Sequence, residues 1–107
     1  MSLTLKESQK KVDEWIQQFE EGYWPPLSMF ASLVEEVGEL GREINDLEGY
    51  KRKRKSSATA LEVEVGDIIF SLICIANYYK IDLERAFWKT LEKYSKRDAQ
   101  RWTPKSR

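Results

Sequence analysis

Residues 35–40 read EEVGEL, and residues 64–68 repeat the pattern as EVGDI. Within each stretch two acids stand three residues apart. Side chains at positions i and i+3 lie on one face of a helix, so each pair can share a cation. The four acids are Glu36, Glu39, Glu64 and Asp67. Two helices packed with these faces together would place four carboxylates around one site, and like charges that close need a compensating cation.

The apolar spacing around both stretches is helical. Residues 26–48 carry an amphipathic stripe, and Gly49 after them is a C-terminal cap. The stripe consists of Phe30, Leu33, Val34, Val37, Leu40, Ile44 and Leu47. A second helix is predicted from a capping box of Thr59 and Glu62 to about Lys80. Because this helix is apolar on nearly all sides, we expect it to be central and buried.

Two more helices are predicted from their end signals. A capping box at Thr4 begins a helix that ends at about Glu21, before Gly22. Asp82 is an N-cap for a helix that ends near Asp98. Because no strand alternation or hairpin signal occurs, the sequence predicts an all-α, four-helix bundle.

The length of 107 residues predicts one domain, with a basic loop at residues 50–57 and a frayed tail at residues 99–107. A domain of this size has a modest core, and its apolar helix favours at least a dimer. Residues 1–48 hold 4 basic and 11 acidic side chains, whereas residues 49–107 hold 14 basic and 7 acidic ones. An acidic half suits a metal site, and a basic half suits an anionic ligand.

The chain has no histidine and one cysteine, Cys74. The lack of histidine excludes Ser-His-Asp and Cys-His catalysis, zinc-finger sites and histidine-ligated di-iron centres. Cys74 lies in an apolar run, so we expect it in the core. A single cysteine and no signal peptide predict a cytoplasmic protein. The longest apolar run is too short to span a membrane.

The four acids differ from those of an ordinary solvated helix face. Glu36 and Glu39 lie beside the apolar stripe, together with Glu43, and none of the three has a basic residue four positions later. Their close neighbours are other acids, and like charges at helical spacing are destabilising. Glu64 and Asp67 belong to the most apolar helix, where an acid without a partner is costly. Both pairs therefore favour one shared metal site.

Four carboxylates without a nitrogen or sulfur ligand select a hard cation, Mg²⁺ or alternatively Mn²⁺. Mg²⁺ keeps several waters and prefers sites that it shares with substrate phosphates. Such an ion polarises a phosphoryl oxygen and activates a bound water. The acids therefore indicate hydrolysis of a phosphoanhydride.

Around these acids the sequence resembles the MazG-like nucleoside triphosphate pyrophosphohydrolases. The family pattern of E-x-x-E, a spacer and E-x-x-D is met by the pairs that begin at Glu36 and Glu64. The likeness covers most of residues 28–98. The chain is similar to the short single-domain members rather than to the two-domain ones.

The resemblance implies an all-α, Mg²⁺-dependent enzyme that hydrolyses an NTP or dNTP to the monophosphate and pyrophosphate. The implied metal ligands are Glu36, Glu39, Glu64 and Asp67. Family members form homodimers or homotetramers, and the site is completed near the subunit interface. Larger members carry an asparagine seven residues after the motif aspartate, where this chain has Cys74. Asn77, three residues further on, is the candidate substrate contact here, and the base and sugar stay open.

Basic side chains supply candidate contacts to the triphosphate. Lys93 and Arg97 share a face of the fourth helix and could hold phosphates, although basic faces of surface helices are commonly solvated. The run 51–55, with Lys53 at its centre, could close over phosphates or remain a solvated loop.

Two further roles have alternatives. Trp24 and Phe30, near the start of the second helix, could stack on a base, although aromatic residues here more often pack in a core or an interface. Glu35 or Glu39 could orient or deprotonate the attacking water, and the sequence does not choose between them.

Two other functions fit parts of the sequence. A non-catalytic nucleotide- or metal-sensing module, acting through a protein partner, would bind nucleotide without turnover. A nucleic-acid binder could use the basic loop and tail, but the net charge is zero and the acidic half would repel phosphates. Release of pyrophosphate distinguishes a pyrophosphohydrolase from both.

Overall fold

The computed structural model describes residues 2–49 and 58–106, so the basic loop with Lys53 lies outside the described residues. Four helices occur in these ranges, and no strand does. They are α1 (Leu5–Gln17), α2 (Pro26–Leu47), α3 (Ala58–Tyr78) and α4 (Leu83–Arg97). The predicted all-α class is confirmed. None of these helices is long and apolar enough to cross a membrane.

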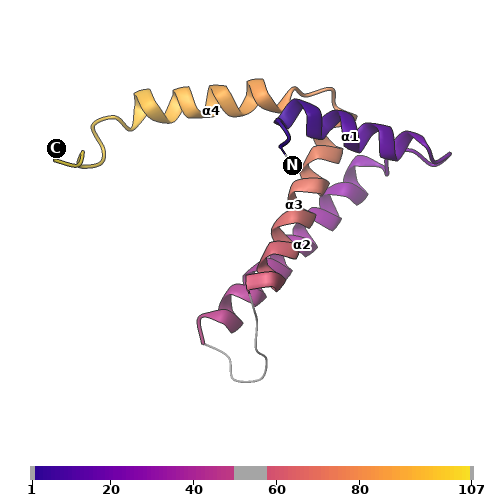
Figure 1. Ribbon diagram of the computed structural model, residues 1–107, viewed down its shortest axis with the longest axis horizontal. Helices are drawn as coiled ribbons and strands as arrows, with labels where there is room; N and C mark the ends of the chain where they lie inside the picture. The colour runs from indigo at the N-terminus through magenta and orange to yellow at the C-terminus, as the bar shows by residue number, and fades with distance from the viewer. Residues whose placement is uncertain (1, 50–57, 107) are drawn as a thin grey trace.

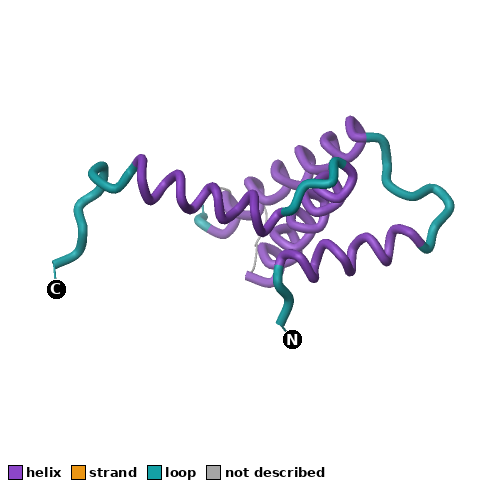
Figure 2. The backbone as a smooth tube through the Cα atoms, turned by 90° about the horizontal axis from the view of Figure 1, so that it is seen from above, coloured by secondary structure: helices purple, strands orange, loops and turns teal. Residues whose placement is uncertain are grey.

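The helices α2 and α3 form an antiparallel pair and lie side by side (Figure 1). Helix α1 lies across the end of this pair where α2 begins and α3 ends. Helix α4 contacts α1 and then extends away from the other helices, so that the C-terminus lies far from the pair (Figure 2). One chain by itself therefore does not close the four helices into the compact bundle that the sequence predicts.

The start of α1 agrees with the prediction, and its end does not. Thr4 forms the expected capping box with Glu7. The helix ends at Gln17 rather than at about Glu21, because amides after it bond to carbonyls only three residues back. Gly22 belongs to this turn and has a φ of 63°, a conformation that glycine adopts without strain.

The predicted capping box at Thr59 is wrong, because α3 begins at Ala58 and Thr59 lies inside its first turn. The other end of α3 is closed by a bond from Ile81 N to Ala76 O at 2.8 Å. This amide reaches five residues back, as in a Schellman motif. Lys80 takes the left-handed position of that motif, with a φ of 59°.

The ends of α2 and the start of α4 agree with the sequence. Helix α2 begins at Pro26 and ends at Leu47, and Gly49 follows with a φ of 81°. Asp82 caps α4, because its Oδ1 accepts a hydrogen bond from Arg85 N at 3.3 Å.

The core of the single chain is small. Its buried apolar side chains are Met29, Ile73, Cys74 and Ala76. The prediction that Cys74 is buried is confirmed. The prediction that α3 is buried on most sides is wrong for one chain, since Val65, Ile69 and Leu72 are exposed. The cause is the placement of α1 across one end of the pair, which covers only the last turns of α3.

The apolar stripe of α2 is also largely exposed. Phe30, Val34 and Val37 each leave half or more of their side-chain surface uncovered, at 56%, 53% and 50%. Two acids of the same helix, Glu43 and Asp46, are buried instead. The face of α2 that is buried in one chain is therefore partly acidic, and much of its apolar face is exposed.

Candidate active site

One face of α2 directs acids toward α3. Ser71 Oγ donates a hydrogen bond to Glu36 Oε1 at 2.5 Å between the two helices. About two helical turns further along α2 stands Glu43, and the same distance back along α3 stands Glu64. Because the helices are antiparallel, these two positions lie at a similar level of the pair. The two acidic stretches therefore face each other across the α2–α3 interface.

The acids of the two helices share one electrostatic environment. The pKa of Glu64 is raised above its ordinary value, first because its carboxyl loses hydration and then because other carboxylates are near. Those carboxylates are Asp67, Glu39, Glu43 and Glu36, in order of decreasing effect. These five residues are called the acid face below. The pKa shift identifies Glu43 as a member that the family pattern does not include.

The acid face fits a hard cation in the chemistry of its donor atoms. All its donors are carboxylate oxygens on two facing helices, and their mutual repulsion would be relieved by a divalent ion. The side chains are not drawn together around one point, however. Within residues 2–49 and 58–106, no three acid or cysteine side chains are close enough to hold a metal. Glu39 and Asp67 are exposed and would have to turn toward the interface.

Arg42 partly neutralises the acid face. Its Nη2 lies 2.8 Å from Glu39 Oε2, and both side chains are about half exposed. The hydrogen bond and the charge of Glu39 raise the pKa of Arg42 above its ordinary value. The sequence predicts no basic partner for Glu39, because that prediction rests on positions four residues later. Arg42 stands three positions after Glu39, a spacing that also allows contact.

An aromatic pocket of about 480 Å³ adjoins the acid face. Its aromatic lining consists of Trp15, Phe19, Tyr23, Trp24 and Phe70. Its polar lining includes Ser32, Glu36 and Ser71. Trp15 meets Phe19 and Phe70 edge to face, with ring centroids 5.1 and 5.8 Å apart. A cavity of this size and chemistry can hold a base with its sugar, and Glu36 belongs to both the pocket and the acid face.

The structure separates the other predicted contacts into near and far groups. Trp24 lines the aromatic pocket, whereas Phe30 is exposed outside its lining. Asn77 lies beside the pocket and bonds to Tyr23 Oη at 3.0 Å. Glu35 is exposed on α2, and its catalytic role stays a prediction.

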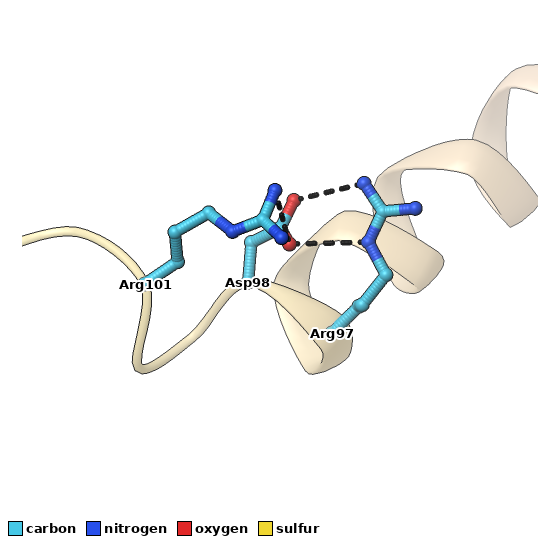
Figure 3. Close-up of polar contacts among 3 residues, drawn as sticks. All are labelled: Arg97, Asp98 and Arg101. Carbon is cyan, nitrogen blue, oxygen red and sulfur yellow. Dashed lines mark hydrogen bonds and ion pairs between the residues drawn. The ribbon is translucent and has the colours of Figure 1, made fainter.

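Lys93 and Arg97 are not brought to the acid face of the same chain. They lie on α4, which extends away from α2 and α3 (Figure 1). Both basic groups lie over the Tyr94 ring, at 4.9 and 4.8 Å from its centroid. Arg97 also donates to the two carboxylate oxygens of Asp98, at 3.1 and 3.2 Å, and Arg101 approaches the same carboxylate at 3.6 Å (Figure 3).

Ser71 and Tyr23 are site residues that sequence reasoning missed. Ser71 stands four residues after Asp67 and seven after Glu64, so helical periodicity places all three on one face. That spacing was a usable signal. Tyr23 had none, because its position depends on how the connection between α1 and α2 folds back on α3.

Comparisons with known proteins show what the chain is similar to. The profile of the family described as the MazG nucleotide pyrophosphohydrolase domain matches residues 25–102. Protein YpjD of Bacillus subtilis (strain 168) is 46% identical over 103 residues, which are 95% of this chain and 93% of that protein.

Two solved structures have a similar fold. The crystal structure of YpjD from Bacillus subtilis has a TM-score of 0.80 at 43% identity, over 88% of this chain and 97% of that one. The crystal structure of a Bacillus-conserved MazG protein, a nucleotide pyrophosphohydrolase, has a TM-score of 0.78 at 44% identity, over 91% of this chain and 95% of that one.

Proposed function

Because the chain belongs to the MazG nucleotide pyrophosphohydrolase family and is a hydrolase, we propose that it hydrolyses an NTP or dNTP to the monophosphate and pyrophosphate with Mg²⁺. The observation that supports this most is the meeting of the acid face and the aromatic pocket at Glu36. A nucleotide joins a flat base to a polyphosphate that carries divalent cations. The aromatic pocket would hold the base, and the acid face would hold the cation that the polyphosphate carries.

The metal ligands in this proposal are Glu36, Glu39, Glu64 and Asp67. A bound Mg²⁺, or Mn²⁺, would neutralise these acids, polarise a phosphoryl oxygen and lower the pKa of a bound water. Ser71 holds one oxygen of Glu36 in place, which leaves the other carboxylate oxygen for the ion. Glu39, or the exposed Glu35, would accept the proton of the attacking water.

Product analysis tests the proposal. Purified protein, Mg²⁺ and a panel of NTPs and dNTPs should yield equal amounts of monophosphate and pyrophosphate. Orthophosphate as the product, or no turnover of any nucleotide by folded protein with Mg²⁺ present, would contradict it. Nucleotide binding without turnover would favour the sensing module instead.

We also propose a homodimer or homotetramer, in the cytoplasm that the single cysteine favours. One face of α2 exposes Leu27, Phe30, Val34, Val37 and Ile44, and α4 exposes Phe87, Trp88, Leu91 and Tyr94. Exposed apolar surfaces of this extent mark interaction sites. A second copy that covers them could also bring its own α4, with Lys93 and Arg97, to the acid face of the first.

Replacing Val34 with aspartate is expected to shift the oligomer toward monomer. Val34 lies in the exposed stripe of α2, and a carboxylate there would lose its hydration in an interface. We expect the dissociation constant to rise by about 5-fold or more, since burying an uncompensated polar group costs about 1–3 kcal/mol. Light scattering after gel filtration measures the mass. Ser28→Asp, outside the stripe on the same helix, should leave the mass unchanged, and a wild-type monomer would reject the oligomer.

Replacing Arg42 with glutamine is expected to tighten Mn²⁺ binding by up to about 5-fold, because an exposed ion pair contributes roughly 0.2–1 kcal/mol. Glu39 must leave Arg42 before it can turn to a cation. Calorimetric titration with Mn²⁺ measures the affinity. Arg85→Gln, on exposed surface of α4, is the control and should bind as wild type does. Weaker Mn²⁺ binding by the Arg42 variant would show that the arginine supports the site.

A further inference from the structure

A hydrogen-bond cluster behind the aromatic pocket connects α1, residues 18–25 and the end of α3. Tyr23 Oη donates to Asp13 Oδ1 at 2.6 Å and accepts from Asn77 Nδ2 at 3.0 Å. The same Nδ2 donates to the Gln9 carbonyl at 3.0 Å, and Gln9 Nε2 donates to Asn77 Oδ1 at 2.9 Å. Both amide hydrogens of Asn77 are therefore used by protein acceptors.

The cluster continues into the turn between α3 and α4. Gln9 Nε2 donates to the Ile81 carbonyl at 2.8 Å, and Gln9 Oε1 accepts from Leu83 N at 2.9 Å. Partial burial and the bond to Asp13 raise the pKa of Tyr23 to about 12. The Tyr23 hydroxyl therefore stays protonated and able to donate into alkaline pH, beyond the range of an ordinary tyrosine.

Tyr23 belongs to this cluster and to the wall of the aromatic pocket. Tyr23 lines the pocket, and so do its chain neighbours Gly22 and Trp24. The backbone bonds of Phe19 and Gly22 hold the segment to the end of α1. The Tyr23 hydroxyl ties the same segment to α3 through Asn77. Without the hydrogen bond between Tyr23 and Asn77, the segment of residues 18–25, which includes Trp24, could move away from α3.

We propose that Asn77 and Tyr23 are positioning residues that set the width of the aromatic pocket for the base of the nucleotide. This inference rests on the proposed function. Asn77 acts here through Tyr23 rather than by touching the substrate, because its amide hydrogens are already bonded. Neither residue belongs to the acid face, so binding of the nucleotide should depend on them and the chemical step should not.

The test compares Tyr23→Phe, Asn77→Leu and the double variant. Each single change removes one partner of the same bond and should raise KM for the preferred nucleotide about 3- to 10-fold, with kcat within about 2-fold of wild type. Because both act through one contact, the double variant should raise KM no more than the larger single effect. Tyr79→Phe and Asn45→Leu make the same chemical changes at exposed positions and should match wild type.

Two outcomes would overturn the proposal. A normal KM for Tyr23→Phe beside an impaired Asn77→Leu would show that Asn77 does not act through Tyr23. A loss of thermal stability with an unchanged KM in both variants would leave the cluster a purely structural role.

Hydrogen–deuterium exchange separates this inference from the proposed function. Residues 18–25 should exchange faster in Asn77→Leu than in wild type, whether or not any nucleotide is hydrolysed. No turnover by wild type would reject the proposed function, and unchanged exchange in these residues would reject the positioning role.

Discussion

Replacing Glu64 with glutamine is expected to lower kcat/KM by about 100-fold or more and to raise the Tm of the metal-free protein at neutral pH. The loss of activity follows from the ligand role of Glu64. Changing a residue that only hydrogen-bonds to a metal ligand already lowers metal affinity or activity by roughly 10- to 100-fold. The gain in Tm follows from the acid face. Glu64 repels four neighbouring carboxylates, and glutamine removes that repulsion at nearly the same size.

The pH dependence of stability tests the same idea without activity. The folded-state pKa of Glu64 is raised, so folding favours its neutral form. This contribution to stability is present below the ordinary glutamate pKa of about 4.3 and is lost as the pH rises through the raised value. The Tm of the metal-free wild type should therefore fall as the pH rises above about 4, and this fall should be smaller in Glu64→Gln.

Glu62→Gln is the matched control for Glu64→Gln. Glu62 is an exposed acid of the same helix, two residues away and so on a different face. It should keep wild-type turnover and the wild-type dependence of Tm on pH. Mg²⁺ should raise the Tm of wild type and of Glu62→Gln but not that of Glu64→Gln, as differential scanning fluorimetry would show. Wild-type turnover in Glu64→Gln would remove Glu64 from the ligand set.

Replacing Trp24 with alanine is expected to raise KM by about 10-fold or more, with a smaller change in kcat. An aromatic side chain that stacks on a base contributes about 1–3 kcal/mol, which corresponds to roughly 5- to 150-fold in affinity. Trp24 lines the aromatic pocket, and its side chain is 60% exposed in one chain, so its loss should affect the pocket more than the core. Steady-state kinetics with the preferred nucleotide measures both constants.

Trp102→Ala separates loss of stacking from loss of any large surface ring. Trp102 is similarly exposed, at 73%, but lies after the end of α4 and outside the pocket. It should leave KM near the wild-type value, and gel filtration would verify that the oligomer is intact. An equal rise of KM in both variants would reject the aromatic pocket as the site of the base.

Local signals in the sequence determined the helices and the paired acids. The capping residues Thr4 and Asp82 act within one turn of their own helix, so their roles could be predicted without knowledge of the rest of the chain. The failure at Thr59 has the same origin, since a cap and an early helical residue look alike when the preceding turn is unknown. The acids at Glu36 and Glu64 were likewise found by spacing alone.

Burial could not be predicted in the same way, because it depends on which helices cover one another. Apolar periodicity shows that a face of α2 or α3 needs a partner, but not whether the same chain supplies it. Val34 and Ile69 are exposed because α1 lies across the end of the pair and α4 extends away. Glu43 is the opposite case, because it is an acidic residue and yet is buried by the packing of the helices.

The sequence by itself therefore determined the helices, the family and the pairs of acids, since all of these are carried by spacing along one chain. Only the tertiary structure decided that Ser71 holds Glu36, that Glu43 joins the acid face and that Asn77 bonds to Tyr23. The physical reason is that the residues in these contacts are far apart in the sequence. The partners in the two hydrogen bonds stand 35 and 54 residues apart, and their contact depends on the register of the antiparallel pair and the path of one connection.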